Sequence, residues 1–266
     1  MADINPVLAL QHSTAAEALP TRTIRHRRLP GRDALATAGL RCMSYAGCSE
    51  LVASPHDVDP RPALRERRGQ IDDQVHGQAQ ARAETKARDG GEGGDDTAAC
   101  AIALGPLMAE VAGSDLARLK AEYSGLFEVG SQGPPAPIRE DLQTGQRAGT
   151  REEVIRFYDY FGYVLGEPFA WQPDHLSMQL EFMHYLCFRE AEAGAGAEAL
   201  SFQLAQLDFT ERHLASWVPQ LAANVGKVAA GSLYDRVVTG VLGFILADLA
   251  WQNETIAAAD SLPPSA

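Results

Sequence analysis

The chain has 266 residues, 45% of them hydrophobic and 22% charged, which excludes a fibrous or wholly disordered protein and suffices for one sizeable core. Its 23 Lys and Arg against 35 Asp and Glu give a net charge of −12, which argues against a nucleic-acid or anionic-membrane binder because both need a basic face. Residues 1–90 carry 13 basic and 11 acidic side chains, whereas residues 91–266 carry 10 and 24. A cationic ligand is therefore drawn to the C-terminal two thirds.

The composition also bears on compartment. The four cysteines show no CxxC spacing and are too few for a disulfide framework in a chain of this length, so we expect reduced, mostly buried thiols. The best apolar run, residues 237–250, is interrupted by Asp248 and is shorter than the roughly 20 residues of a membrane span. Arg27 and Arg28 are followed by Pro30 rather than by an apolar stretch, so an export signal is not predicted. We expect a cytoplasmic protein.

The first third of the chain is weakly patterned. Residues 1–32 lack apolar periodicity and are expected to form a loosely held tail, followed by a helix over residues 33–52. Residues 54–62 contain three prolines and read as a connection. Residues 63–87 predict a polar, exposed helix, and residues 89–96, DGGEGGDD, predict a flexible acidic loop.

The rest of the chain is strongly patterned. Ser114 is expected to cap one helix, Thr150 and Glu153 to form a capping box for another, and Asp174 to start and cap a third. Residues 130–149 are too rich in Gly and Pro for regular structure and predict a long loop. Apolar spacing predicts helices over residues 98–111, 114–127, 150–165, 174–189, 198–217 and 232–252, with Leu214, Trp217 and Trp251 in the core.

These elements define the expected fold. Sustained two-residue alternation and Asn-Gly hairpins are missing from the sequence, so strands have little support and the fold class is all-α. No heptad repeat is sustained, which favours a globular helical bundle over a coiled coil. We expect a single domain over residues 33–256 with a joint near residues 166–175, and a C-terminal tail over residues 257–266.

Metal and nucleotide chemistry have little support in the sequence. Glu181 and His184 form one half of a di-iron carboxylate motif, but no other histidine has Glu three residues before it. His184 and Cys187 share a helix face, but a zinc site needs three or four ligands, and Cys187 lies on an apolar stripe. Phosphate-binding and hydrolase motifs do not occur. We expect no metal and no cofactor; a metal- or nucleotide-dependent helical enzyme remains the alternative.

The break between the two strongest helices is unusual. It holds Glu167, Trp171, Asp174 and His175 within ten residues. One reading of Asp174 is a helix cap alone, but an acidic residue, an imidazole and aromatic surface together also describe a pocket for a peptide with basic and apolar residues.

Three separated stretches carry further motifs. Residues 123–135, YSGLFEVGSQGPP, have a Tyr-x-x-Leu-Phe segment ahead of a proline-containing loop. Residues 173–175, Pro-Asp-His, are followed by Leu-Glu-Phe-Met at 180–183, and residues 209–219 read FTERHLASWVP. Together they resemble the TorD/DmsD/NarJ family of redox-enzyme maturation chaperones. The long Gly- and Pro-rich insert and the helix with Phe157, Tyr158 and Phe161 look most like those of members that serve the type II branch of dimethyl sulfoxide reductase-like molybdoenzymes.

The resemblance implies an all-helical, cofactor-free cytosolic chaperone that performs no reaction. It would bind the catalytic subunit of a molybdoenzyme before molybdenum cofactor insertion and delay its export, recognising the twin-arginine signal peptide, a nearby segment or the apo-subunit itself. The protein would be a monomer or a domain-swapped dimer, with guanine nucleotide as a possible modulator. A structural subunit of the mature enzyme is a third option.

The family's client-peptide-binding residues carry over to five positions. Asp174 would pair with a client arginine or amide, and His175 would donate a hydrogen bond or stack. Tyr123 and Phe127 would supply apolar surface, although plain core packing at this spacing is an equal alternative for both. Glu181 would be a further contact.

Overall fold

The computed structural model describes residues 34–86, 96–131, 133–145, 149–166, 169–194 and 197–260. Within them the chain is helical and has no strand, only two isolated β-bridges, which confirms the all-α bundle. The expected tail at residues 1–32 lies outside the described residues, whereas the last helix continues to Asp260, past the expected end of the domain. The helices are α1 (Ala34–Val52), α2 (Arg61–Lys86), α3 (Asp96–Gly113), α4 (Leu116–Tyr123), η2 (Ser124–Glu128), α5 (Glu140–Gln143), α6 (Thr150–Phe161), α7 (Leu176–Ala193), α8 (Ala197–Phe209), η4 (Thr210–Leu214), α9 (Val218–Ala229) and α10 (Leu233–Asp260).

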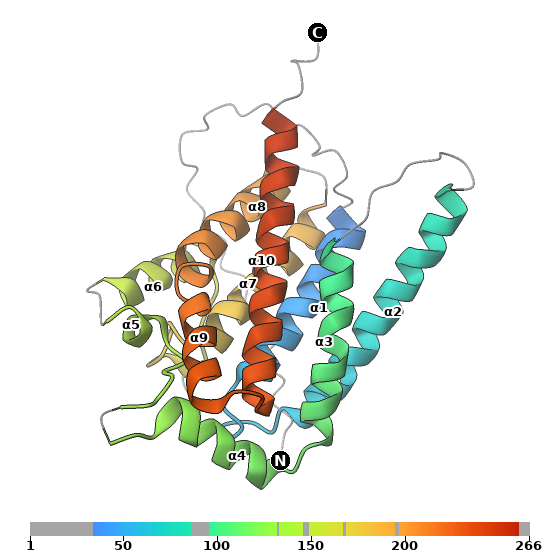
Figure 1. Ribbon diagram of the computed structural model, residues 1–266. Helices are drawn as coiled ribbons and strands as arrows, with labels where there is room; N and C mark the ends of the chain where they lie inside the picture. Colours follow the sequence, from blue (N-terminus) through green and yellow to red (C-terminus); the bar gives the residue numbers. More distant parts are fainter. Residues whose placement is uncertain are drawn as a thin grey trace.

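Helices α1 and α7 form the centre of the bundle (Figure 1) and pack against each other. Helix α8 packs on α7, while α3 and α9 pack on α10. Their facing stripes bury Tyr45, Phe182, Trp217 and Phe244 almost completely. Each such side chain contributes about 1.5–3 kcal/mol to folding, so this contact, rather than helix propensity, holds the helices together.

Helix α2 lies at the edge of the molecule, beside α1 and α3 (Figure 1). Most of its described side chains are exposed, as its polar sequence predicts. Leu64 and Ile71, seven residues apart and therefore on one face, are nevertheless fully buried. Two apolar side chains at the right spacing thus suffice to dock this helix.

Two expected single helices each end in a π-helical turn. The expected helix over residues 114–127 is α4 followed by η2, in which the Val129 N–H donates to the Ser124 carbonyl five residues back. The expected helix over residues 198–217 is α8 followed by η4, closed by the Ala215 N–H on the Thr210 carbonyl. A π-turn holds one extra residue, so the side chains that follow it are rotated from the positions that a continuous α-helix would give them. Apolar spacing in the sequence does not reveal this rotation.

The structure corrects three expected helix starts. Asp115, not Ser114, caps α4, through a bond from the Arg118 N–H. Gly149, with φ of 93°, precedes α6, so that Thr150 is already helical and forms no capping box. This helix also ends at Phe161 rather than at residue 165, because Gly162 adopts a left-handed conformation.

The third correction concerns α7, which begins two residues after the expected start. His175 is its N-cap, and its imidazole accepts a hydrogen bond from the Ser177 N–H. Asp174 lies outside the helix, and its carboxylate points to other partners. An imidazole can replace the usual capping oxygen because a neutral ring nitrogen is also an acceptor.

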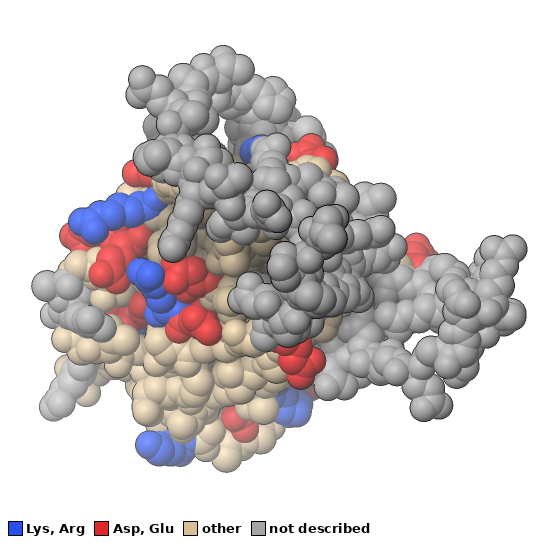
Figure 2. Space-filling model, turned by 90° about the horizontal axis from the view of Figure 1, so that it is seen from above, with Lys and Arg blue, Asp and Glu red and all other residues tan. Residues whose placement is uncertain are grey.

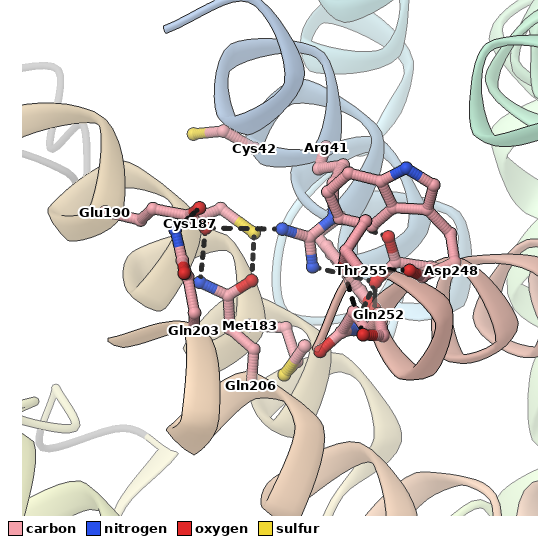
Figure 3. A network of polar contacts seen from close by, with 12 residues as sticks. Arg41, Cys42, Met183, Cys187, Glu190, Gln203, Gln206, Asp248, Gln252 and Thr255 are labelled. Carbon is pink, nitrogen blue, oxygen red and sulfur yellow. Dashed lines mark hydrogen bonds and ion pairs between the residues drawn. The ribbon is translucent and has the colours of Figure 1, made fainter. Parts of the chain in front are cut away.

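A buried polar network joins four helices in the middle of the bundle (Figure 3). The guanidinium of Arg41, on α1, is fully buried, bonds through two nitrogens to Asp248 on α10, and lies 3.3 Å from Glu190 on α7. Glu190 in turn accepts hydrogen bonds from Gln203 and Gln206 on α8. A buried charge must be paired in this way because water cannot solvate it. The network fixes α1 against the C-terminal half.

Candidate functional site

The site predicted at the joint is formed by two irregular segments that lie side by side. One is the segment between α6 and α7, and the other is the described part of the expected Gly- and Pro-rich loop, which contains the short helix α5 that the sequence did not predict. Arg139 and His175 form an antiparallel β-bridge, with the Glu140 N–H on the Asp174 carbonyl and the Leu176 N–H on the Ile138 carbonyl. Backbone pairing therefore makes the two segments one unit.

Asp174 is fully buried at the centre of this unit. Its Oδ1 accepts from the Arg139 Nε and Nη2 at 3.3 and 3.2 Å and lies 3.5 Å from the Arg151 Nε, while its Oδ2 accepts from the Asp141 N–H at 3.1 Å. Burial by itself would raise the pKa of Asp174, but its hydrogen bond with Asp141 and the charge of Arg139 hold it below the ordinary value. Asp174 is therefore ionised and paired within the chain.

Asp141 completes an ionic cluster of two carboxylates and two guanidinium groups. Its Oδ2 accepts from the Arg139 Nη2 at 3.0 Å, while its Oδ1 is buried with no hydrogen-bond partner. Burial and the neighbouring Asp174 carboxylate raise the pKa of Asp141 to about 6. The cluster is electrically balanced at neutral pH and gains a positive charge when Asp141 takes up a proton.

His175 connects three parts of the fold. Because its Nδ1 accepts from the Ser177 N–H, the proton of the neutral ring is on Nε2, which lies 3.0 Å from the Tyr123 hydroxyl. That hydroxyl donates to the Val52 carbonyl at the end of α1. Burial lowers the pKa of His175 to about 4, so the ring is neutral at physiological pH. Its observed contacts all lie within the chain.

Tyr123 and Phe127 lie together, as the sequence predicted, and both are buried. Their rings meet edge to face at 4.9 Å, and each also contacts the Tyr234 ring at the start of α10. Edge-to-face aromatic pairs each add about 0.5–1.5 kcal/mol beyond area burial. In this conformation both side chains act as core.

Glu181 is not brought together with the other four predicted residues. It lies on α7 and is half-buried, and it forms no hydrogen bond or ion pair with any other described residue. Its neighbour His184 is buried rather than at the helix edge, with Nδ1 donating to the Cys42 carbonyl at 2.9 Å. Among the described residues, no group of three His, Cys, Asp or Glu could hold a metal ion.

A second polar cluster, beneath α5, was missed by sequence reasoning. The buried Glu140 carboxylate accepts from the Gln179 amide and lies 3.1 Å from the His213 Nδ1. The Trp217 indole donates to the His213 carbonyl and to Gln179 at 3.2 Å. His213 and Trp217 stand in the FTERHLASWVP motif that the sequence displayed, whereas nothing in the long loop singled out Glu140.

The surface of the joint offers both apolar and charged side chains. Trp171 is 62% exposed, and Tyr160 and Val164, near the end of α6, are 66% and 82% exposed. Figure 2 shows the molecule from above the view of Figure 1, and on that face acidic and basic side chains lie interleaved. Glu167, which the sequence placed at this joint, lies outside the described residues.

Part of the chain is similar to known proteins. Residues 94–223 match the family model described as nitrate reductase delta subunit. This region of the chain is similar to that family. The match includes four of the clustered joint residues, Tyr123, Glu140, Asp174 and His213, and excludes α1, α2 and α10. The matched region therefore contains both segments of the joint, whereas Arg41 and Asp248 of the buried network lie outside it.

Curated proteins resemble the chain over part of its length. It is 40% identical over 104 residues to the chlorate reductase assembly chaperone protein of Ideonella dechloratans, which is 38% of this chain and 54% of that protein. It is 38% identical over 105 residues to the selenate reductase assembly chaperone protein of Thauera selenatis, again 38% of this chain and 54% of the relative. The perchlorate reductase assembly chaperone protein of Dechloromonas aromatica strain RCB is 34% identical over 128 residues, or 46% of this chain and 56% of that protein.

The chain thus spans just over half the length of these relatives. No solved structure matches it. In the described part of the chain, no helix is long and apolar enough to cross a membrane.

Proposed function

We propose that this protein is an assembly chaperone for the catalytic subunit of a molybdenum-containing reductase of the type II branch of the dimethyl sulfoxide reductase family. It binds the empty subunit in the cytoplasm, assists molybdenum cofactor insertion and delays export until assembly is complete. The protein itself catalyses no reaction. The observation that carries the proposal is the match of residues 94–223, which contain the joint, together with relatives named as reductase assembly chaperones.

The client segment is the twin-arginine signal peptide or the chain close to it. A net charge of −12 attracts a peptide with adjacent arginines and raises its encounter rate. Exposed Trp171 beside the ionic cluster offers apolar contact to the residues that follow those arginines. Such a peptide is disordered when free, so ordering it offsets part of the contact energy and keeps binding reversible, as a carrier requires. The chaperone acts as a monomer or as a domain-swapped dimer.

The five predicted site residues serve this function in different ways. Asp174 is the carboxylate for a client arginine, which reaches it by replacing one of the chain's own arginines. His175, Tyr123 and Phe127 are buried, so they hold the joint in shape and contact the client only if it opens. Glu181 is a separate contact farther along α7.

Co-expression with a tagged reductase catalytic subunit, in medium with and without molybdate, tests the function. We expect the full-length chaperone to co-purify mainly with the subunit that lacks molybdenum, as measured by metal analysis. Equal capture of loaded and empty subunits, or capture of neither, would refute the proposal.

The docking place is tested by Trp171→Ala, which keeps the backbone carbonyl used by Arg151. Val58→Ala is the matched control, because Val58 is 61% exposed and lies between α1 and α2, away from the joint. We expect the Trp171 variant to capture several-fold less subunit at an unchanged unfolding temperature, and the control to capture as much as the wild type. Equal capture by both variants would move the docking place elsewhere.

A further inference from the structure

Two arginines of the chain share the Asp174 carboxylate, and they are held differently. Arg139 bonds to both Asp174 and Asp141, and its side chain is 19% exposed. Arg151 is 40% exposed, and its Nε lies 3.5 Å from Asp174 without forming a hydrogen bond. Its only hydrogen bond to a described residue runs from Nη2 to the Trp171 carbonyl. Arg151 is thus the exposed and weakly bonded partner.

The position of Arg151 has no local structural advantage. It is the second residue of α6, next to the unpaired N–H groups and the positive end of the helix dipole, where a cation is unfavourable by about 0.3–1 kcal/mol. Its neighbours Glu152 and Glu153 have the sign that this position favours. Helix formation therefore does not explain Arg151, and its contacts at the joint must.

We propose that the Asp174 carboxylate and the Trp171 carbonyl form a binding site for a guanidinium group, which Arg151 occupies as an internal competitor until an arginine of the client displaces it. The inference rests on the proposed function, because it assumes that the client segment presents an arginine. The observed occupant shows which ligand chemistry the site accepts: the planar group has one edge toward a carboxylate and another toward a carbonyl, as guanidinium recognition requires.

Displacement needs little rearrangement. The exposed Arg151 side chain can swing into water, while Arg139 and the Asp141 N–H continue to hold Asp174 in place. The exchange keeps the ion-pair count constant, so the buried carboxylate is never left without a partner. The site can bind a client arginine only while Arg151 is away from it. The apparent dissociation constant therefore equals the intrinsic one divided by the fraction of time that the site is free. A site free one tenth of the time binds about tenfold more weakly.

The test measures binding of a fluorescein-labelled synthetic peptide, two adjacent arginines followed by a leucine- and alanine-rich stretch, to the full-length protein by fluorescence anisotropy. Arg151→Gln removes the competitor and one positive charge. Arg156→Gln is the matched control, since it removes the same charge from an exposed position of α6 that has no hydrogen bond or ion pair to any described residue.

We expect Arg151→Gln to lower Kd about tenfold and Arg156→Gln to lower it less than about twofold. Arg151→Lys should be intermediate, since an ammonium cannot span both acceptors as the planar group does. Adding Asp174→Asn to Arg151→Gln should abolish the gain. Should Arg151→Gln unfold, the lysine variant still decides, because the proposal requires Arg151→Lys to bind the peptide more tightly than both the wild type and Arg156→Gln.

Equal effects of the two glutamine variants, or weaker binding by Arg151→Gln, would overturn the competitor role of Arg151. Peptide binding by the wild type, and with it the proposed function, would remain intact. Tighter peptide binding by Arg151→Gln but not by Arg156→Gln would support the role of Arg151 as a competitor. Absence of binding by the wild type and every variant would overturn both.

Discussion

Replacing Asp248 by Ala should lower the free energy of unfolding by far more than the loss of a single charge suggests. The Asp248 carboxylate accepts hydrogen bonds from the Arg41 guanidinium, from the Tyr45 hydroxyl at 2.7 Å and from the Gln252 amide at 2.6 Å, and all four side chains are fully buried. Without it, Glu190, at 3.3 Å, is the one carboxylate among the described residues that still pairs with Arg41. Removing one partner of a buried pair costs about 3–5 kcal/mol, against a total stability of about 5–15 kcal/mol.

Urea unfolding followed by circular dichroism measures this cost. At a slope of about 2–3 kcal/mol per M, the midpoint should fall by about 1–2.5 M. Glu254→Ala is the control on the same helix, because Glu254 is exposed and has no ion pair with any described residue, and it should change stability by less than about 0.5 kcal/mol. Combining Arg41→Met with Asp248→Ala should cost less than the sum of the two single changes, because neither charge is then left alone.

The pH dependence provides a second check on the same pair. Burial by itself would raise the pKa of Asp248, but Arg41, Tyr45 and Gln252 outweigh it and lower the pKa below its ordinary value. The stabilisation is therefore present above the unfolded-state pKa of about 3.9 and is lost as the pH falls through the folded-state value. A cost of Asp248→Ala below about 1 kcal/mol at pH 7, or additive single and double changes, would refute the reasoning.

Three further predictions concern other groups. Glu140→Ala leaves the buried Gln179 amide without its acceptor and should lower the free energy of unfolding, measured in urea, by about 1–3 kcal/mol. A change within experimental error would show that this contact does not hold α5 against the bundle. Asp141 takes up its proton near pH 6 in the folded state but near pH 3.9 when unfolded, so lowering the pH from about 7 to about 5 adds positive charge to the joint. Arginine-peptide binding should weaken over that range in the wild type and stay flatter in Asp141→Asn, and identical pH profiles would count against it. Burial raises the pKa of the Cys42 thiol to about 12, so mass spectrometry should find it unalkylated by iodoacetamide at about pH 8 until urea is added.

Much of the fold followed from the sequence. Apolar spacing predicted the helices from α1 to α10 except two: the one-turn α5, which is too short to have a period, and α9, which lies where the sequence predicted only a break between two helices. It placed Leu214 and Trp217 correctly in the core. Trp251 is only half-buried and lies over the Arg41 guanidinium at 4.9 Å. Helix ends were less predictable because two capping groups of similar propensity stood next to each other, as with Ser114 and Asp115.

The sequence by itself determined the helical class, the acidic character and the motifs at residues 123–127, 173–183 and 209–219, because periodicity and composition are local properties. Only the tertiary structure decided how these motifs are used. It placed Asp174 in a buried ionic cluster with Arg139 and Arg151, and it placed Glu140, the first residue of α5, against Gln179. The free energy of a charged side chain depends on the partners that the fold brings to it and on the water that the fold removes, and neither is a function of neighbouring residues in the chain.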